Sequence, residues 1–205
     1  FITNFKKDIT IVSEKMEVQF QGQNDFYFQE SKSFNSSYET PYQHKQINDI
    51  SIKNYIGFPF LAANTSGSRI LLTESDLEDH PGMWIKKTES NTFVSTHAGY
   101  PLEIIKIKNA YRDGQVKKHA NYIAKTKGSR SFPWRLFAIA ENDGELLTNT
   151  LVYQLAKPLQ LKDVSWIKSG VVAFDWWGKL NIYGVDFKAG VNTETAKYFI
   201  DFAKK

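Results

Sequence analysis

Apolar and polar residues alternate over short stretches through most of the chain, which is the period of strands that bury one face. Turn residues separate these stretches, as in Asn64-Thr65-Ser66-Gly67. Residues 30–48, rich in Ser, Tyr, Asn and Gln, are expected to form a long irregular loop. Regular short strands with turns between them indicate a β-sandwich. The predicted strands are 9–12, 16–20, 26–28, 58–62, 69–73, 83–86, 92–95, 102–107, 134–140 and 150–155.

The pattern changes near the end of the chain. Residues 171–174 are apolar and predict a buried strand, while the final residues predict one helix with Asn192 as its cap. A strand, a loop and a helix in this order begin a β/α unit. We expect the domain boundary within residues 157–169, where Pro158 and mixed polar residues suggest a linker. The apolar stripe of the helix consists of Ala196, Phe199, Ile200 and Ala203.

A carboxylate and two indoles stand together where the strand at 171–174 ends, as Asp175, Trp176 and Trp177. A sugar ring offers an apolar face that an aromatic ring covers and hydroxyls from which a carboxylate accepts. The alternative is a buried strand whose aromatic side chains fill the core. An ionised Asp175 would be costly to bury there without a partner. We therefore predict that the three residues bind sugar.

Glu74 ends the predicted strand at 69–73 and begins an acidic run with Asp76, Glu78 and Asp79. Oxygen-rich segments suit a hard divalent cation, although acidic loops are more often simply solvated. The histidines have neither the paired helical spacing of a zinc site nor a cysteine nearby, so surface or loop positions are expected for them. They are His44, His80, His97 and His119.

Composition narrows the function classes only slightly. The chain has 205 residues, of which 41% are hydrophobic and 15% aromatic, enough for one or two domains with a real core. It has no cysteine, which excludes disulfides and thiolate chemistry. The net charge of +4 is spread along the chain, and no apolar run approaches a membrane span. Basic and aromatic residues between 117 and 130 could bind nucleic acid, but a solvated basic loop explains them more simply.

Three separated segments resemble, in the right order, motifs of glycoside hydrolase family 97, a family of α-glucosidases and α-galactosidases. The first is residues 73–83, with the sequence TESDLEDHPGM. The second is Phe132-Pro133-Trp134-Arg135, and the third is residues 165–195, which include the Asp-Trp-Trp sequence. The resemblance is clear from about residue 49 to the end of the chain.

The resemblance implies a mainly β fold. Residues 1–160 would be the C-terminal portion of an N-terminal β-sandwich of the galactose-mutarotase-like supersandwich type. Residues 161–205 would be a linker and the first β/α unit of a catalytic (β/α)8 barrel. Since a full barrel needs about 250 residues, the sequence is expected to be an internal fragment of a longer enzyme.

The same resemblance implies roles for individual residues. Glu74 would be the carboxylate that the sandwich gives to an active-site Ca²⁺, and Asp175, Trp176 and Trp177 would line the sugar pocket. The catalytic acid and base would lie further along the barrel, so no catalytic residue is assigned in this chain. One carboxylate supplies too few of the roughly six to eight oxygen ligands that Ca²⁺ takes, so the chain alone should bind calcium poorly. Arg135 would clamp the sandwich against the barrel.

The expected function is therefore part of a calcium-dependent, exo-acting α-glycoside hydrolase, an α-galactosidase or an α-glucosidase, that cleaves terminal sugars from oligosaccharides. Asp175 slightly favours the galactosidase branch. The expected partners are an oligosaccharide and the remainder of the same enzyme chain, without nucleic acid or a membrane span, in the periplasm or outside a bacterium. The alternative is a non-catalytic carbohydrate-binding β-sandwich, which has no reason to end in a β/α unit.

Overall fold

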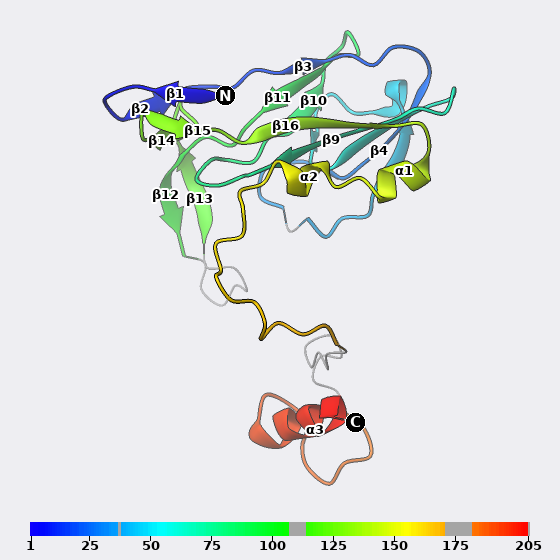
Figure 1. The fold of residues 1–205 in the computed structure, drawn as a ribbon, viewed down its shortest axis with the longest axis vertical. Helices are drawn as coiled ribbons and strands as arrows, with labels where there is room; N and C mark the ends of the chain where they lie inside the picture. Colours follow the sequence, from blue (N-terminus) through cyan, green and yellow to red (C-terminus); the bar gives the residue numbers. More distant parts are fainter. Residues whose placement is uncertain (37, 107–113, 171–181, 205) are drawn as a thin grey trace. The chain divides into compact units, whose positions relative to one another are not determined.

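The computed structural model describes residues 1–36, 38–106, 114–170 and 182–204. It forms two compact units, Phe1–Lys157 and Pro158–Lys205. Almost all regular structure of the first unit is strand, whereas the second contains a helix (Figure 1).

The first sheet of the larger unit has five strands, all antiparallel to their neighbours. Its central strands carry alternating buried side chains because one face of the sheet covers the core. In spatial order the strands are β16 (Trp134–Ala140), β9 (Arg69–Ser75), β8 (Phe60–Asn64), β4 (Asn24–Phe28) and β6 (Gln43–Gln46).

The second sheet also has five antiparallel strands and supplies the opposite wall of the core. In spatial order they are β3 (Glu17–Val18), β11 (Phe93–Thr96), β10 (Trp84–Lys87), β7 (Tyr55–Ile56) and β5 (Glu30–Ser31).

The core lies between the two sheets. Phe26, Phe60 and Leu72 of the first sheet join Ile85 and Phe93 of the second in one buried cluster. The rings of Phe60 and Phe93 have centroids 4.9 Å apart, so the sheets are in direct contact. Two sheets that interdigitate their inner side chains make a β-sandwich, as predicted. The barrel start at 161–205 stays a prediction.

Three antiparallel strand pairs extend the larger unit. Residues 117–130 were predicted to be a solvated basic loop, but three of these strands lie there at least in part, so the prediction of a loop was wrong. The first of the three, β13 (Gln115–His119), is fully exposed. Lys117 and Lys118 are adjacent and all five residues are exposed, so no alternation of apolar and polar residues marks this strand in the sequence. The pairs are β1 (Ile2–Asn4) with β15 (Ser129–Ser131), β2 (Ile9–Ile11) with β14 (Ala124–Thr126), and β12 (Pro101–Ile105) with β13 (Gln115–His119).

The predicted irregular loop at 30–48 is also wrong in part. It contains β5 and β6 and a short 3-10 helix, η1 (Ile47–Asp49). Strand β6 is at the edge of its sheet, where polar and charged side chains are common. Its own residues have a weak propensity for strands. Its side chains pair with polar partners on neighbouring segments, for example Lys45 with Glu30 at 2.5 Å.

The strand predicted at 150–155 is instead a helix, α2 (Leu151–Gln154). It follows α1 (Asp143–Leu147), which was not predicted either. Asn142 is the N-cap of α1, because its side chain accepts from the Glu145 N–H at 3.1 Å, and the Glu145 carboxylate in turn accepts from the Glu141 N–H at 2.9 Å. Helix α2 lies next to β9, where Ser75 Oγ donates to the carbonyl of Val152 at 2.5 Å.

The smaller unit contains α3 (Thr193–Lys204). Asn192 caps it as predicted, accepting from the Thr195 N–H at 2.9 Å. Residues 171–181 are outside the described residues, and with them the predicted sugar-binding residues Asp175, Trp176 and Trp177. No helix in the described ranges is both long and apolar enough to cross a membrane.

Candidate functional site

Glu74 stands one residue before the end of β9, directly opposite Arg135 in β16. Antiparallel neighbours in register put both side chains on the same face of the sheet. Arg135 Nη1 donates to Glu74 Oε1, and the Met83 N–H donates to the same oxygen at 3.0 Å. The Glu74 side chain is only 11% exposed. The predicted metal ligand is therefore a buried carboxylate held by an arginine and a backbone amide.

A second carboxylate, Glu14, completes this arrangement. Arg135 binds it through two parallel hydrogen bonds, Nε to Oε1 at 2.6 Å and Nη2 to Oε2 at 2.8 Å. One guanidinium thus joins two carboxylates in the fork geometry that favours arginine. No sequence pattern marks Glu14, which lies in the irregular segment between β2 and β3. The described hydrogen bonds of Arg135 to carboxylates stay within the sandwich, so the clamp against a barrel remains a prediction.

Two histidines flank Glu14. His80 Nε2 lies 3.4 Å and His97 Nε2 lies 3.7 Å from Glu14 Oε2, and both side chains are 1% exposed. Both lie in loops, as predicted, His80 between β9 and β10 and His97 between β11 and β12, but their side chains are buried, whereas those of His44 and His119 are exposed. Within the part of the chain that the structure describes, His80 Nδ1 and His97 Nε2 have no hydrogen-bond partner. His80 belongs to the 73–83 motif, which was the available signal, whereas nothing in the sequence marked His97.

Burial and ion pairing set the protonation states of this cluster. Burial raises the pKa of Glu14, but the hydrogen bonds to His80 and Arg135 outweigh it and lower the pKa to about 2. Burial lowers the pKa of His97 to about 4, so its imidazole is neutral near neutral pH. Burial also raises the pKa of Glu74, against the opposing charge of Arg135. We call Glu14, Glu74, His80, His97 and Arg135 the charged end of the sandwich.

A cavity of about 420 Å³ opens beside the charged end. Its lining brings Glu14, His80 and Arg135 together with the aromatic rings of Phe132 and Trp134. Trp134 is 49% exposed, and its indole can therefore meet a ligand. Aromatic faces beside charged and hydrogen-bonding groups are the two kinds of contact that a sugar ring takes.

The rest of the acidic run is engaged by basic groups. Lys157 forms ion pairs with Glu78 and, at 3.9 Å, with Asp76. Arg130 donates to the backbone carbonyls of Glu78 at 3.0 Å and Asp79 at 3.2 Å. The carboxylates of Asp76 and Glu78 thus share one lysine, and Arg130 binds the backbone of the run.

The described residues on their own do not build a calcium site. Among them, no three His, Asp or Glu side chains are grouped to hold a metal ion. Both described bonds of the Glu74 carboxylate use Oε1, so Oε2 is the oxygen that could ligate a cation. A single oxygen is far from the shell of six to eight that Ca²⁺ takes.

Comparison with known proteins places this fold. The family model for the glycosyl-hydrolase 97 N-terminal domain matches residues 1–158. A retaining alpha-galactosidase of Bacteroides thetaiotaomicron is 34% identical over 216 residues, which cover 99% of this chain and 32% of that protein. The chain thus spans about a third of the length of this curated relative.

Solved structures agree in fold. A glycoside hydrolase family 97 enzyme from Pseudoalteromonas sp. strain K8, in complex with acarbose, superposes with a TM-score of 0.75 at 24% identity. The alignment covers 98% of this chain and 28% of that one. A variant of that enzyme in complex with panose gives a TM-score of 0.74 with the same coverage and identity. The resemblance carried by the three sequence motifs is confirmed: the chain belongs to glycoside hydrolase family 97, and residues 1–158 match its N-terminal domain.

Proposed function

We propose that this chain is part of an α-glycoside hydrolase that removes terminal α-linked sugars from oligosaccharides. The match of residues 1–158 to the family's N-terminal domain carries this proposal. An α-galactoside is the first substrate to test, because the relative at 34% identity is a retaining alpha-galactosidase. An α-glucoside is the second. The reaction would follow the two-carboxylate chemistry of glycosidases, with both carboxylates outside this chain.

The charged end would be the part of the sandwich that supports the active site. Arg135 fixes the orientation of Glu74, since it holds one oxygen of that carboxylate while also bound to Glu14. Burial of the Glu74 side chain prevents it from rotating freely. This chain would thus supply a carboxylate of fixed orientation, and Asp175, Trp176 and Trp177 would contact the sugar by stacking and hydrogen bonding.

We also propose that the enzyme requires Ca²⁺, with Glu74 Oε2 as the one ligand from the sandwich. A bound calcium ion would supply a fixed positive charge at the sugar. The remaining ligands would come from outside the described residues. As a family 97 hydrolase acting on oligosaccharides, the protein would work in the periplasm or outside a bacterial cell.

The first experiment is hydrolysis of p-nitrophenyl α-galactoside and α-glucoside by the native protein, with and without a calcium chelator, together with its intact mass. We expect a mass well above the 23.6 kDa of this chain and cleavage that the chelator abolishes. The 205-residue chain alone should cleave neither substrate. Cleavage by that chain would contradict our placement of the catalytic carboxylates, and a native protein inactive on both substrates would contradict the proposed activity.

Calcium is tested separately by calorimetric titration of the native protein. Glu74→Gln should weaken calcium binding by at least about tenfold, a loss that is already typical of an outer-shell partner. The matched control is Glu78→Gln, which removes a neighbouring carboxylate that is paired with Lys157. Equal calcium affinities for the two variants would show that Glu74 is not a ligand.

A further inference from the structure

A second cavity lies at the opposite end of the sandwich from the charged end. It has a volume of about 530 Å³ and lies between the β3–β4 connection, η1 and the β10–β11 turn. Asn24, in its wall, is paired with Asn64 at the end of β8, close to the start of β9. Glu74 lies near the far end of β9, roughly 20 Å away at the rise of a strand. The cavity is therefore separate from the candidate active site.

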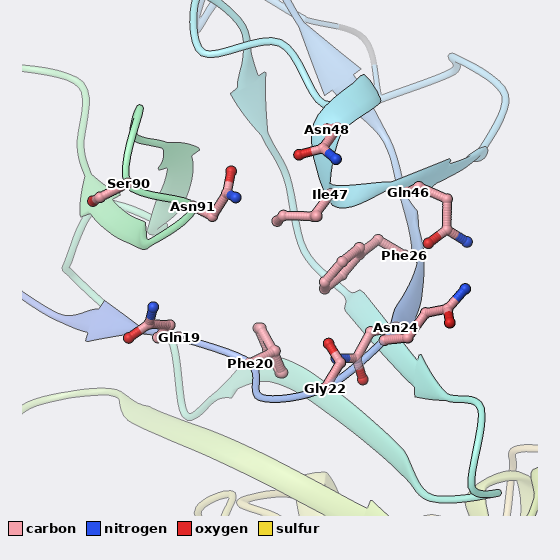
Figure 2. A pocket seen from close by; sticks show the side chains of 11 residues that line it. Gln19, Phe20, Gly22, Asn24, Phe26, Gln46, Ile47, Asn48, Ser90 and Asn91 are labelled. Carbon is pink, nitrogen blue, oxygen red and sulfur yellow. The ribbon is translucent and has the colours of Figure 1, made fainter.

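The lining of this cavity is uncharged. Figure 2 shows Gln19 and Phe20 on one side and Asn91, Ile47 and Asn48 on the other, with Phe26 between them. No lining residue carries an ionisable side chain. Carboxamides dominate the polar part, which consists of Ser90 and the six carboxamides of Gln19, Gln23, Asn24, Gln46, Asn48 and Asn91. We call this cavity the neutral pocket.

Most of these carboxamides are free to bind a ligand. Asn24 and Gln46 are the exceptions. The Asn24 side chain donates to the carbonyls of Gln21 and Gly22 at 2.9 and 3.2 Å. Gln46 donates to Asp25. In contrast, the side chains of Gln19, Gln23, Asn48 and Asn91 form no hydrogen bond with any described residue. Each offers a donor and an acceptor.

The apolar part of the neutral pocket is rigid. Phe20 packs against three core rings, with centroids 5.6 Å from Phe26, 5.8 Å from Phe60 and 5.9 Å from Phe93. Ile47 of η1 packs against the same core. The wall therefore belongs to the sandwich core and would not need to form when a ligand binds.

We propose that the neutral pocket binds an uncharged carbohydrate and is a non-catalytic site. Carboxamides can both donate to and accept from sugar hydroxyls, and the apolar wall can cover the C–H face of a ring. An ionised ligand would find no opposite charge among the lining residues and would lose hydration on entering. The choice of a sugar over other neutral polyols as the ligand rests on the proposed function, whereas the presence of an uncharged pocket does not depend on it.

The test is an NMR titration of the isotope-labelled chain with galactose, glucose, melibiose and maltose, with galacturonate as the charged comparison. We expect millimolar binding of at least one neutral sugar. The shift changes should centre on residues 19–24, 46–48 and 90–91. No change with any sugar at tens of millimolar, changes centred elsewhere, or equally tight binding of galacturonate would overturn the proposal.

Two variants locate the site. Asn48→Ala and Asn91→Gly each remove a free carboxamide, and each should weaken binding about three- to tenfold, as expected for one lost hydrogen bond. Glycine suits position 91 because its backbone has φ of 58°. The matched control is Gln115→Ala, an exposed carboxamide on β13. Unchanged affinity in both variants would overturn the assignment. The titration involves no hydrolysis, so its result is independent of the proposed activity.

Discussion

The two ends of the sandwich carry opposite kinds of polar residues, paired charged groups at one end and uncharged carboxamides at the other. At the charged end, an arginine, two carboxylates and a histidine are linked by hydrogen bonds or ion pairs and are largely buried. At the other end, the neutral pocket is surrounded by carboxamides, four of which have no partner among the described residues. The sandwich core between them, centred on Phe60 and Phe93, is common to both.

The comparison shows where the sandwich depends on its polar residues. At the charged end each buried group needs the others, because an unpaired buried charge is costly. In the neutral pocket the free side chains do not contribute to folding through hydrogen bonds and are available to a ligand. Residues at the charged end should therefore be costly to change, and most residues of the neutral pocket should not.

The largest expected effect follows Arg135→Ala. The change leaves Glu14 and Glu74 without their shared cation, and breaking a buried pair in this way costs about 3–5 kcal/mol. Urea unfolding of the 205-residue chain measures it as a lower midpoint with the same slope. Arg135→Lys should recover only part of the loss, because an ammonium cannot form the two parallel bonds to Glu14.

The matched control is Arg69→Ala. Arg69 begins the same strand, β9, and pairs with Asp143 at 2.6 Å, but Asp143 is highly exposed. An exposed pair contributes little, so this variant should unfold close to the wild type. If the two alanine variants lost equal stability, burial would not be what distinguishes the charged end.

The second prediction concerns acid sensitivity. Burial lowers the pKa of His97 from 6.5 to about 4, so between these values the unfolded chain binds a proton that the folded chain does not. Stability is therefore complete above about pH 6.5 and decreases as the pH falls to about 4, by about 3 kcal/mol. Glu14, with a pKa of about 2 in place of 4.5, adds a further loss below pH 4.5. Glu74 acts in the opposite sense, because its raised pKa removes stability as the pH rises through it.

His97→Gln isolates the histidine contribution. Glutamine cannot titrate, so the difference in unfolding free energy between wild type and variant should change between pH 6.5 and 4, whereas Glu14 and Glu74 are present in both proteins. Urea unfolding at several pH values gives this difference. A difference that is constant with pH would mean that His97 is not held neutral by burial.

The sandwich could be predicted from the sequence wherever one face of a strand is buried. The prediction for β16 was correct to the residue, since Leu136, Ala138 and Ala140 alternate with exposed positions. Polar edge strands such as β6 and β13 lack that signal. Helix α2 was missed because its apolar residues fit a strand, while the local bond from Leu151 N–H to Asn149 Oδ1 at 2.9 Å favours a helical turn.

Only those residues of the candidate site that belong to the family motifs could be predicted from the sequence. Glu74 and Arg135 belong to two of the family segments, and the register of β9 and β16 brings them together. Glu14 and His97 are 83 positions apart in the sequence and meet only because the fold places both beside Arg135. No local pattern encodes such a contact. The neutral pocket was missed for the same reason, since three separate connections form it.

A third prediction tests whether one residue of the neutral pocket is structural. Asn24 is 6% exposed, and besides its two donor bonds its Oδ1 accepts from Asn64 Nδ2 at 3.3 Å. Asn24→Ala should cost about 1–3 kcal/mol, because it removes the three hydrogen bonds of a buried side chain. Unfolding in urea measures the loss. A loss as large as that of Arg135→Ala would remove the contrast between the two ends.

The smallest effect is expected for the free carboxamides of the neutral pocket. Asn48→Ala should change the free energy of unfolding by less than about 0.5 kcal/mol, because the side chain is exposed and has no described hydrogen bond. Urea unfolding measures this change.

At Asn91, two substitutions distinguish the contribution of the backbone conformation to stability from that of the side chain. The φ of 58° at this position suits glycine and disfavours alanine. Asn91→Gly should therefore be close to neutral, whereas Asn91→Ala should be less stable by about 1 kcal/mol. Equal losses for glycine and alanine would mean that the Asn91 side chain itself stabilises the fold, and the neutral pocket would then resemble the charged end.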